Sequence, residues 1–274
     1  VLVPAGAFAL FYASLVVFLL LDNEPIVPLA GEPAGQRTVV IFGASGTAGD
    51  GILKAALASP DIDRIHVITR RTTARMNAGA VSGKVQVTLH TDYLDYSTIH
   101  EQIGAADAVF WAIGTSSVGV DEETYGKIHV DFPVHFVREW IRVSKNEDIS
   151  FHYISSSDIS EDSSMMWARE KVRAEQTLFG LAEGSRLRVI AYRPDYIGPT
   201  QEQAHLGQEL LYWFFAPVRA AVRAQRIGEA MLEVTVRGGA FDNGDRLGTA
   251  SILRHSDAYR NRQSLPGANR RTGV

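Results

Sequence analysis

A strand, a glycine turn and a helix, beginning at Thr38, constrain this chain more than any other segment. Residues 38–57 read TVVIFGASGTAGDGILKAAL. The opening β-branched and aromatic run suits a buried parallel strand, and apolar residues recur at helical spacing after Gly43, Gly46 and Gly49. Glycines permit a tight turn and a close approach to a pyrophosphate, whose charge a helix N-terminus stabilises. The segment therefore predicts a dinucleotide-binding turn, and the alternative is a structural turn in another α/β protein.

The second predicted strand, RIHVITRR at residues 64–71, refines the expected cofactor. An NAD site places an acidic side chain at the tip of this strand, where it binds the ribose 2′-hydroxyl. Here the tip carries Arg70 and Arg71, and guanidinium groups bind a 2′-phosphate better than a diol. We therefore expect NADP(H) in preference to NAD(H). The alternative is a solvated, basic strand end.

Strands and helices continue to alternate along the chain, which predicts an α/β fold with a doubly wound parallel sheet of the Rossmann type. The later strands end at Asp92 and Tyr93, at Ala112 before Gly114, at Ser155–Ser157, and at Arg193 and Pro194. Ligands of such sheets bind at the carboxyl ends of the strands. The cofactor-binding residues that we expect are Gly43, Ser45, Gly46, Thr47, Gly49, Arg70, Arg71, Asp92, Tyr93, Ala112, Gly114, Lys171, Arg193 and Pro194.

The N-terminal stretch VLVPAGAFALFYASLVVFLLL, residues 1–21, carries no charge. A membrane span needs about 20 apolar residues. We therefore expect a transmembrane helix over residues 1–22 with the lipid bilayer as its partner, followed by a proline-rich linker over residues 23–37. A signal peptide is the first alternative, but a basic n-region and a clear cleavage site are missing. A buried core helix is the second, but it would normally show a polar face.

Composition excludes several other classes of function. The formal net charge of −4 gives no indication of a nucleic-acid partner. The chain has no cysteine, which excludes disulfides, zinc–thiolate sites and a cysteine nucleophile, and we expect no metal site.

Seven short motifs together resemble the atypical, NAD(P)H-binding kind of short-chain dehydrogenase/reductase. They are GASGTAG, ITRR, TDYLD, WAIGT, YISSSD, MWAREKVRAE and YRPDYIG. Their order and spacing are more specific than any one motif. The chain resembles in particular the Tat-interacting oxidoreductase-like group and its bacterial relatives. The resemblance covers residues 38–261, and the first 37 residues and the tail at residues 262–274 lie outside it.

The resemblance implies a catalytic set of serine, tyrosine and lysine. In that family the serine ends the fifth strand and hydrogen-bonds the substrate carbonyl, and the tyrosine hydroxyl transfers a proton. The lysine, four residues after the tyrosine, holds the nicotinamide ribose and lowers the tyrosine pKa. By position the serine is Ser155 or Ser156 and the lysine is Lys171, but Trp167 occupies the place of the tyrosine.

Trp167 changes the chemistry that this set can perform. An indole N–H donates a hydrogen bond but does not titrate near neutral pH, so it can orient a carbonyl but cannot act as acid or base. Their i, i+4 spacing puts Trp167 and Lys171 on one helix face, so we expect both beside the nicotinamide half of the cofactor. Alternatively, Trp167 is a core aromatic residue. Tyr153, Asp158 and Tyr192 are candidate replacement proton carriers, and the sequence does not distinguish among them.

The C-terminal part predicts a small helical cap. We expect residues 206–228 to cover a substrate pocket, or to contact a bilayer or a partner, and Pro217 to end the first helix of this segment.

Two functions remain open. One is an NADP(H)-dependent reductase or epimerase with a modified Ser/Trp/Lys site. The other is a catalytically inactive, cofactor-binding accessory subunit or assembly factor of a membrane protein complex. For both we expect a membrane-anchored protein whose Rossmann domain lies on the cytoplasmic or organelle-matrix side.

Overall fold

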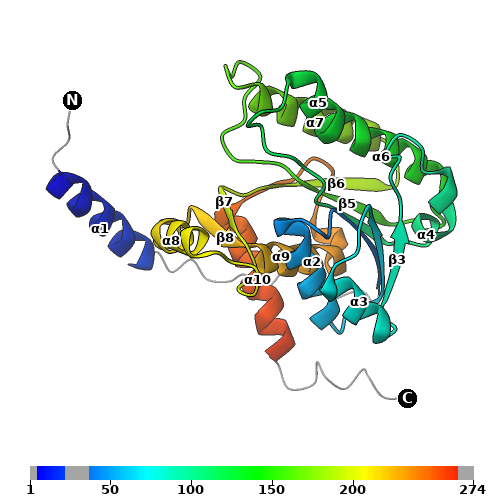
Figure 1. The fold of residues 1–274 in the computed structure, drawn as a ribbon, viewed down its shortest axis with the longest axis horizontal. Coiled ribbons are helices and arrows are strands. Elements are labelled where there is room, and N and C mark those ends of the chain that lie inside the picture. The colour runs from blue at the N-terminus through cyan, green and yellow to red at the C-terminus, as the bar shows by residue number, and fades with distance from the viewer. Residues whose placement is uncertain (1–4, 22–36, 265–274) are drawn as a thin grey trace.

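A seven-stranded, wholly parallel sheet forms the centre of the molecule (Figure 1). The structure, a computed structural model, describes residues 5–21 and 37–264. The strands of the sheet, in chain order, are β1 (Arg37–Phe42), β2 (Ile62–Thr69), β3 (Val85–Leu89), β4 (Ala108–Trp111), β5 (Ile149–Ile154), β6 (Leu187–Arg193) and β9 (Arg246–Gly248). Their spatial order is β3-β2-β1-β4-β5-β6-β9. The chain adds strands to one side of β1 up to β3, and then adds β4 and the later strands on its other side. The predicted doubly wound parallel sheet is therefore confirmed.

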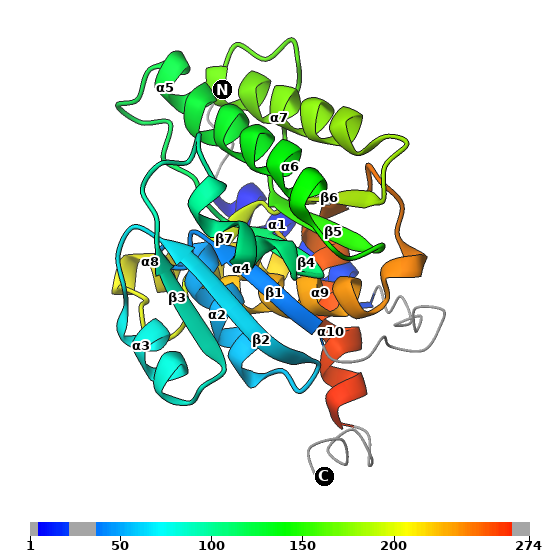
Figure 2. The same ribbon diagram turned by 90° about the vertical axis from the view of Figure 1, so that its right-hand side faces the viewer.

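Helices cover both faces of the sheet. The helical segments are α1 (Ala5–Leu21), α2 (Thr47–Ala58), α3 (Ala74–Val81), η1 (Ser97–Ile99), α4 (His100–Gly104), α5 (Glu122–Gly126), η2 (Lys127–Asp131), α6 (Phe132–Val143), α7 (Met166–Ala182), α8 (Leu206–Phe215), η3 (Ala216–Val218), α9 (Ala224–Val236), η4 (Gly238–Ala240) and α10 (Thr249–Ser264). Helices α6 and α7 lie on one face, and α2, α9 and α10 lie on the other (Figures 1 and 2). A separate two-stranded sheet joins β7 (Tyr196–Gly198) to β8 (Ala221–Arg223).

Apolar side chains form a separate core on each face of the sheet. On β1, residues 39–42 have no exposed surface, because adjacent positions point alternately into the two cores. Phe42 packs against Trp111 and Phe136 in the core beneath α6. This packing holds the carboxyl ends of β1 and β4 together at the edge where the glycine turn leaves the sheet.

The prediction of a transmembrane helix is wrong. Among the residues that the structure describes, no helix is both long enough and apolar enough to cross a membrane. Helix α1 is apolar but has 17 residues. At about 1.5 Å per residue it spans about 25 Å, short of the roughly 30 Å of a bilayer core. The fold class that we expected from the sequence loses its membrane-spanning part, and the expected membrane anchoring is not supported.

Helix α1 instead rests against α8 and η3, away from the sheet (Figure 1). The Tyr12 ring stacks on the Phe214 ring with 5.3 Å between centroids, and Arg219 donates to the Leu19 carbonyl oxygen at 2.9 Å. The outer side chains of the two helices form an exposed set that we call the α1–α8 apolar surface: Leu10, Phe11, Phe18, Leu206, Leu210 and Trp213.

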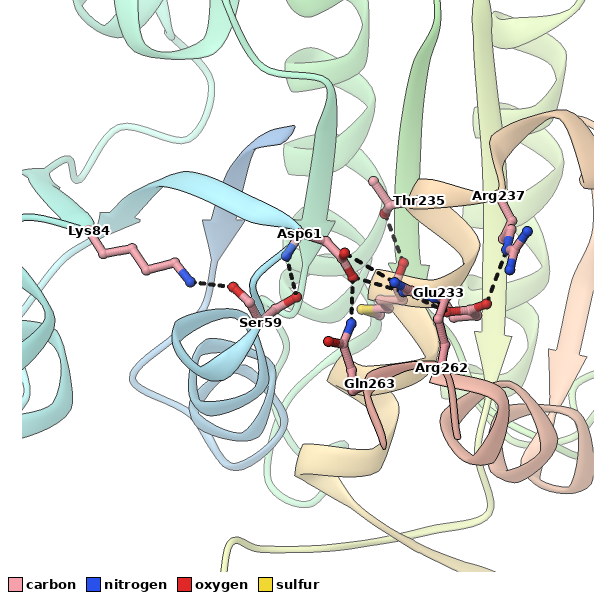
Figure 3. Close-up of polar contacts among 9 residues, drawn as sticks. Ser59, Asp61, Lys84, Glu233, Thr235, Arg237, Arg262 and Gln263 are labelled. Atoms are coloured by element: carbon pink, nitrogen blue, oxygen red, sulfur yellow. Dashed lines mark hydrogen bonds and ion pairs between the residues drawn. The ribbon is translucent and has the colours of Figure 1, made fainter. Parts of the chain in front are cut away.

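A polar cluster ties the C-terminal helices to the amino end of β2, opposite the glycine turn (Figure 3). Asp61 accepts two hydrogen bonds from Arg262, at 2.8 and 3.0 Å, and one from Gln263. Arg262 also donates to the buried Glu233 at 2.9 Å. Arg262 and Gln263, which we assigned to the tail from the sequence, thus belong to α10. Ser264 ends that helix, and residues 265–274 of the predicted tail and 23–36 of the linker lie outside the described residues.

Candidate functional site

The glycine turn between β1 and α2 is shaped so that its backbone can cradle an anion. Gly43 has φ +75°, and a Cβ there would lie 2.4 Å from the carbonyl carbon of Ala112. A Cβ at Gly49 would lie 2.1 Å from the Gly43 carbonyl oxygen. Gly46 caps α2 without a side-chain hydrogen bond, which leaves the first N–H groups of the helix available to a ligand.

A cavity of about 600 Å³ lies along the carboxyl ends of the first four strands. It is lined by Gly43, Ser45, Gly46, Thr69, Arg70, Arg71, Thr91, Tyr93, Ala112, Ile113, Gly114, Thr115, Thr124, Lys127, Ile128 and Phe132. These lining residues include three cations and no carboxylate. The cavity therefore favours an extended, anionic ligand.

Arg70 and Arg71 leave β2 with exposed side chains at the mouth of the cavity. Within the described part of the chain, neither guanidinium has an ion-pair or hydrogen-bond partner. Tyr93 lines the same cavity, and burial raises the pKa of its hydroxyl while Arg70 opposes the rise. Asp92 has another role, because its carboxylate accepts from the Leu94 N–H at 3.0 Å and closes a turn.

The sequence reasoning missed a group of residues on a π-helical turn, η2, that borders the cavity. Lys127 lines the cavity, and the His129 ring stacks on Tyr125 at 4.0 Å. The Thr115 N–H donates to His129 Nε2 at 3.2 Å. Burial, and secondarily Lys171, lowers the pKa of His129 to about 3, so its ring is neutral at physiological pH. The segment YGKIHVDFP read as an ordinary amphipathic helix, and the histidine and lysine within it were the available signal.

Lys171 hydrogen-bonds the end of β5, at the residue before Ser155. Lys171 is 6% exposed, and its Nζ donates to the Ile154 carbonyl oxygen at 2.8 Å and to the Tyr153 hydroxyl at 3.3 Å. Burial lowers the pKa of Lys171 to about 7, with Glu175 opposing the shift. Ser155 is buried, and its Oγ has no hydrogen-bond partner among the described residues. Trp167, one helical turn before Lys171, is half-buried.

The remaining expected residues divide between structural contacts and a second cavity. Ser156 is half-buried beside Ser155. Arg193 donates to the buried Glu175 at 2.9 Å, so its guanidinium is already paired, and Pro194 accepts from the Ser157 N–H. Thr47 lies in a second cavity of about 460 Å³, between α2 and the segment that leads into α8.

The candidate replacement proton carriers are held by other contacts or lie at the surface. The Tyr153 hydroxyl donates to the His129 carbonyl oxygen at 3.0 Å, and the Tyr192 hydroxyl lies 2.9 Å from His152 Nδ1. Asp158 is exposed, with a positive φ of 51°. None of the three lines the cavity.

Solved structures with a similar fold include short-chain dehydrogenase/reductases. One from Saccharomyces cerevisiae superposes with a TM-score of 0.60 at 14% identity, covering 78% of this chain and 96% of its own. A 3-oxoacyl-[acyl-carrier protein] reductase from Brucella melitensis, in complex with NAD, gives 0.61 at 16% identity, covering 82% and 98%. The protein BdcA, in complex with NADPH, gives 0.59 at 15% identity, covering 78% and 93%. No protein-family model matches the sequence, and no curated protein sequence matches it. The chain thus has the fold of short-chain dehydrogenase/reductases.

Proposed function

We propose that this chain is an NADP(H)-binding oxidoreductase of the short-chain dehydrogenase/reductase type that reduces a carbonyl group. The observation that carries the proposal is the pair of free guanidinium groups, Arg70 and Arg71, at a cavity that begins on the glycine turn. Arginine binds phosphate through charge-assisted, often bidentate hydrogen bonds. The similar folds solved with NADPH and with NAD support a nicotinamide dinucleotide as the ligand.

The residues present fit that ligand in both charge and shape. The N–H groups of the first turn of α2, which follows Gly46, would hold the pyrophosphate, and Arg70 and Arg71 would hold the 2′-phosphate. Tyr93 and Ala112 also line this cavity. When bound, a reduced nicotinamide supplies a hydride. Ser155, buried with a free Oγ, would orient the carbonyl that accepts it.

Calorimetric titration with NADPH and NADH tests the cofactor. We expect tighter binding of NADPH, and in Arg70→Ala/Arg71→Ala a loss of NADPH affinity of about tenfold or more, with little change for NADH. The matched control is Arg64→Ala, which removes an exposed arginine from the same strand, away from the cavity. Equal affinities for the two cofactors in the unmodified protein would contradict the proposal.

A second candidate is a cofactor-binding accessory subunit without catalytic activity. It is favoured by Trp167 in place of the tyrosine and by the α1–α8 apolar surface, on which Leu10, Phe11 and Trp213 are each more than 60% exposed. Exposed apolar patches of this kind often mark interaction sites. Incubation of the protein with NADPH and a panel of aldehydes and ketones separates the two candidates. If the protein binds NADPH but oxidises it with none of these carbonyl compounds, the result favours the accessory subunit.

A further inference from the structure

We propose that His129 is a positioning residue of the nucleotide cavity, whose ring fixes the backbone of Gly114 and Thr115 as a wall of that cavity. This inference rests on the proposed function, because it takes the ligand to be a nicotinamide dinucleotide. Gly114 and Thr115 line the cavity, whereas His129 lies behind them. The ring therefore acts on the ligand through the backbone that it contacts.

One ring nitrogen of His129 is within hydrogen-bond distance of both backbone groups of Thr115. The Thr115 N–H donates to Nε2 at 3.2 Å, and the Thr115 carbonyl oxygen lies 3.3 Å from the same nitrogen. In the Nδ1–H tautomer Nε2 accepts from the N–H, and in the Nε2–H tautomer it donates to the carbonyl oxygen. In either tautomer the ring holds the backbone of a residue that lines the cavity.

The ring also packs against Gly114 so closely that a side chain does not fit between them. A Cβ at Gly114 would lie 2.9 Å from His129 Cε1, and the three atoms nearest to it would all belong to this ring. Carbon atoms in favourable contact are about 3.5–4.0 Å apart, so the ring or the backbone would have to shift. The contact with His129 thus accounts for the glycine in the WAIGT motif.

Contacts on other sides fix the position of His129 itself. Its ring stacks on the Tyr125 ring, with 4.0 Å between centroids. Its carbonyl oxygen accepts from the Tyr153 hydroxyl at 3.0 Å, and this hydroxyl accepts from Lys171 Nζ at 3.3 Å. His129 is 3% exposed. It therefore joins α5, β5 and α7 to the wall of the cavity.

The π-helical turn η2 places its residues on two sides of one short segment. Lys127 and Ile128 line the cavity, and Lys127 is exposed, whereas His129 is buried. A displacement of His129 would therefore move two parts of the cavity lining, one after β4 and one on η2. Single π-helical turns are frequent at functional sites.

A matched pair of substitutions tests the contact between His129 and Thr115. Because burial lowers the pKa of His129 to about 3, the ring is neutral at physiological pH, and the neutral amide of His129→Gln supplies a donor and an acceptor in its place. His129→Leu supplies neither. In calorimetric titration we expect NADPH affinity to fall about tenfold or more in His129→Leu, and by much less in His129→Gln.

The control is His135→Leu, which changes an exposed histidine on α6 and should leave NADPH affinity unchanged. Unchanged affinity in His129→Leu would overturn the inference and leave the proposed function intact. Equal losses in His129→Leu and His129→Gln would also overturn it, because the volume of the ring, and not its hydrogen bond, would then decide binding. An unmodified protein that binds neither NADPH nor NADH would overturn both.

Gly114→Ala gives a second test that leaves His129 in place and applies even if His129→Leu does not fold. The added Cβ meets the ring, so we expect NADPH affinity to fall about threefold or more. In the His129→Ala background the ring is absent, and Gly114→Ala should have little further effect. Unchanged affinity in Gly114→Ala, or the same loss in both backgrounds, would overturn the inference, since the latter means that the methyl group contacts the ligand and not the ring.

Discussion

At the scale of single residues, Lys171 shows how burial decides the chemistry of a side chain. The resemblance to short-chain dehydrogenase/reductases implies a lysine that holds a cofactor ribose. In the folded chain the hydrogen-bond partners of its Nζ among the described residues are neutral oxygens, those of Ile154 and Tyr153. Removing an ammonium from water without pairing it favours the neutral amine. Lys145, by contrast, is exposed to solvent.

Stability should therefore depend on pH through Lys171. Burial lowers its pKa to about 7, so between about pH 7 and pH 10 the folded protein binds fewer protons than the unfolded chain, and stability rises with pH. In Lys171→Met the buried charge is absent. We therefore expect the variant to be more stable, relative to the unmodified protein, at about pH 6 than at about pH 9.

Urea unfolding at the two pH values measures this difference. Lys145→Met serves as the control, since an exposed lysine should give the same difference at both. A pH-independent difference for Lys171→Met would mean that the folded protein keeps this lysine charged throughout.

At the scale of elements, the glycine turn depends on how closely β1, α2 and β4 approach one another. Gly43 and Gly49 allow backbone contacts that a side chain would prevent, and Ala112 on the chain after β4 supplies one wall. The turn and the helix N-terminus are thus a single unit, and a change in one should alter the other.

Gly49→Ala tests this unit. The added Cβ would meet the Gly43 carbonyl oxygen at 2.1 Å, so the turn must shift. We expect destabilisation of about 1–3 kcal/mol and a marked loss of NADPH affinity. Gly180→Ala is the matched control: it lies within α7 in open space, and should stabilise the protein by about 0.5–1 kcal/mol. Thermal unfolding and NADPH titration measure both effects, and unchanged affinity in Gly49→Ala would separate the turn from ligand binding.

At the scale of the whole molecule, α1 is peripheral to the sheet and its two cores. Its contacts fall on α8 and η3, through Tyr12, Phe214 and Arg219. The sheet begins at Arg37, and the cavity draws its lining from residues 43–132.

Deleting residues 1–36 should leave a folded protein that binds NADPH with little change in affinity. Because Leu10, Phe11 and Phe18 are removed with α1, we also expect weaker self-association than in the full chain. NADPH titration and light scattering measure the two effects. Aggregation of the shortened chain, or loss of NADPH binding, would show that α1 supports the fold of the nucleotide-binding core.

The sequence by itself determined the sheet and its first turn. Strand and helix periodicities are local, and parallel strands separated by helices leave few topologies open. The same holds for Gly43, Gly46 and Gly49, whose need for a side-chain-free backbone is a local property. The length of an apolar helix is harder to predict from local sequence. The apolar run over residues 1–21 predicted a membrane span, whereas the helix described there, α1, has 17 residues.

Only the tertiary structure decided which polar side chains remain available. Arg193 was expected at the cofactor and is paired with Glu175, whereas Arg70 and Arg71 lack partners among the described residues. The π-helical turn η2 that brings Lys127 to the cavity has no signature in hydrophobic spacing. Pairing and desolvation depend on which elements pack together, because charges interact through space and lose water only when another surface covers them. The uncompensated burial of Lys171 is the clearest case.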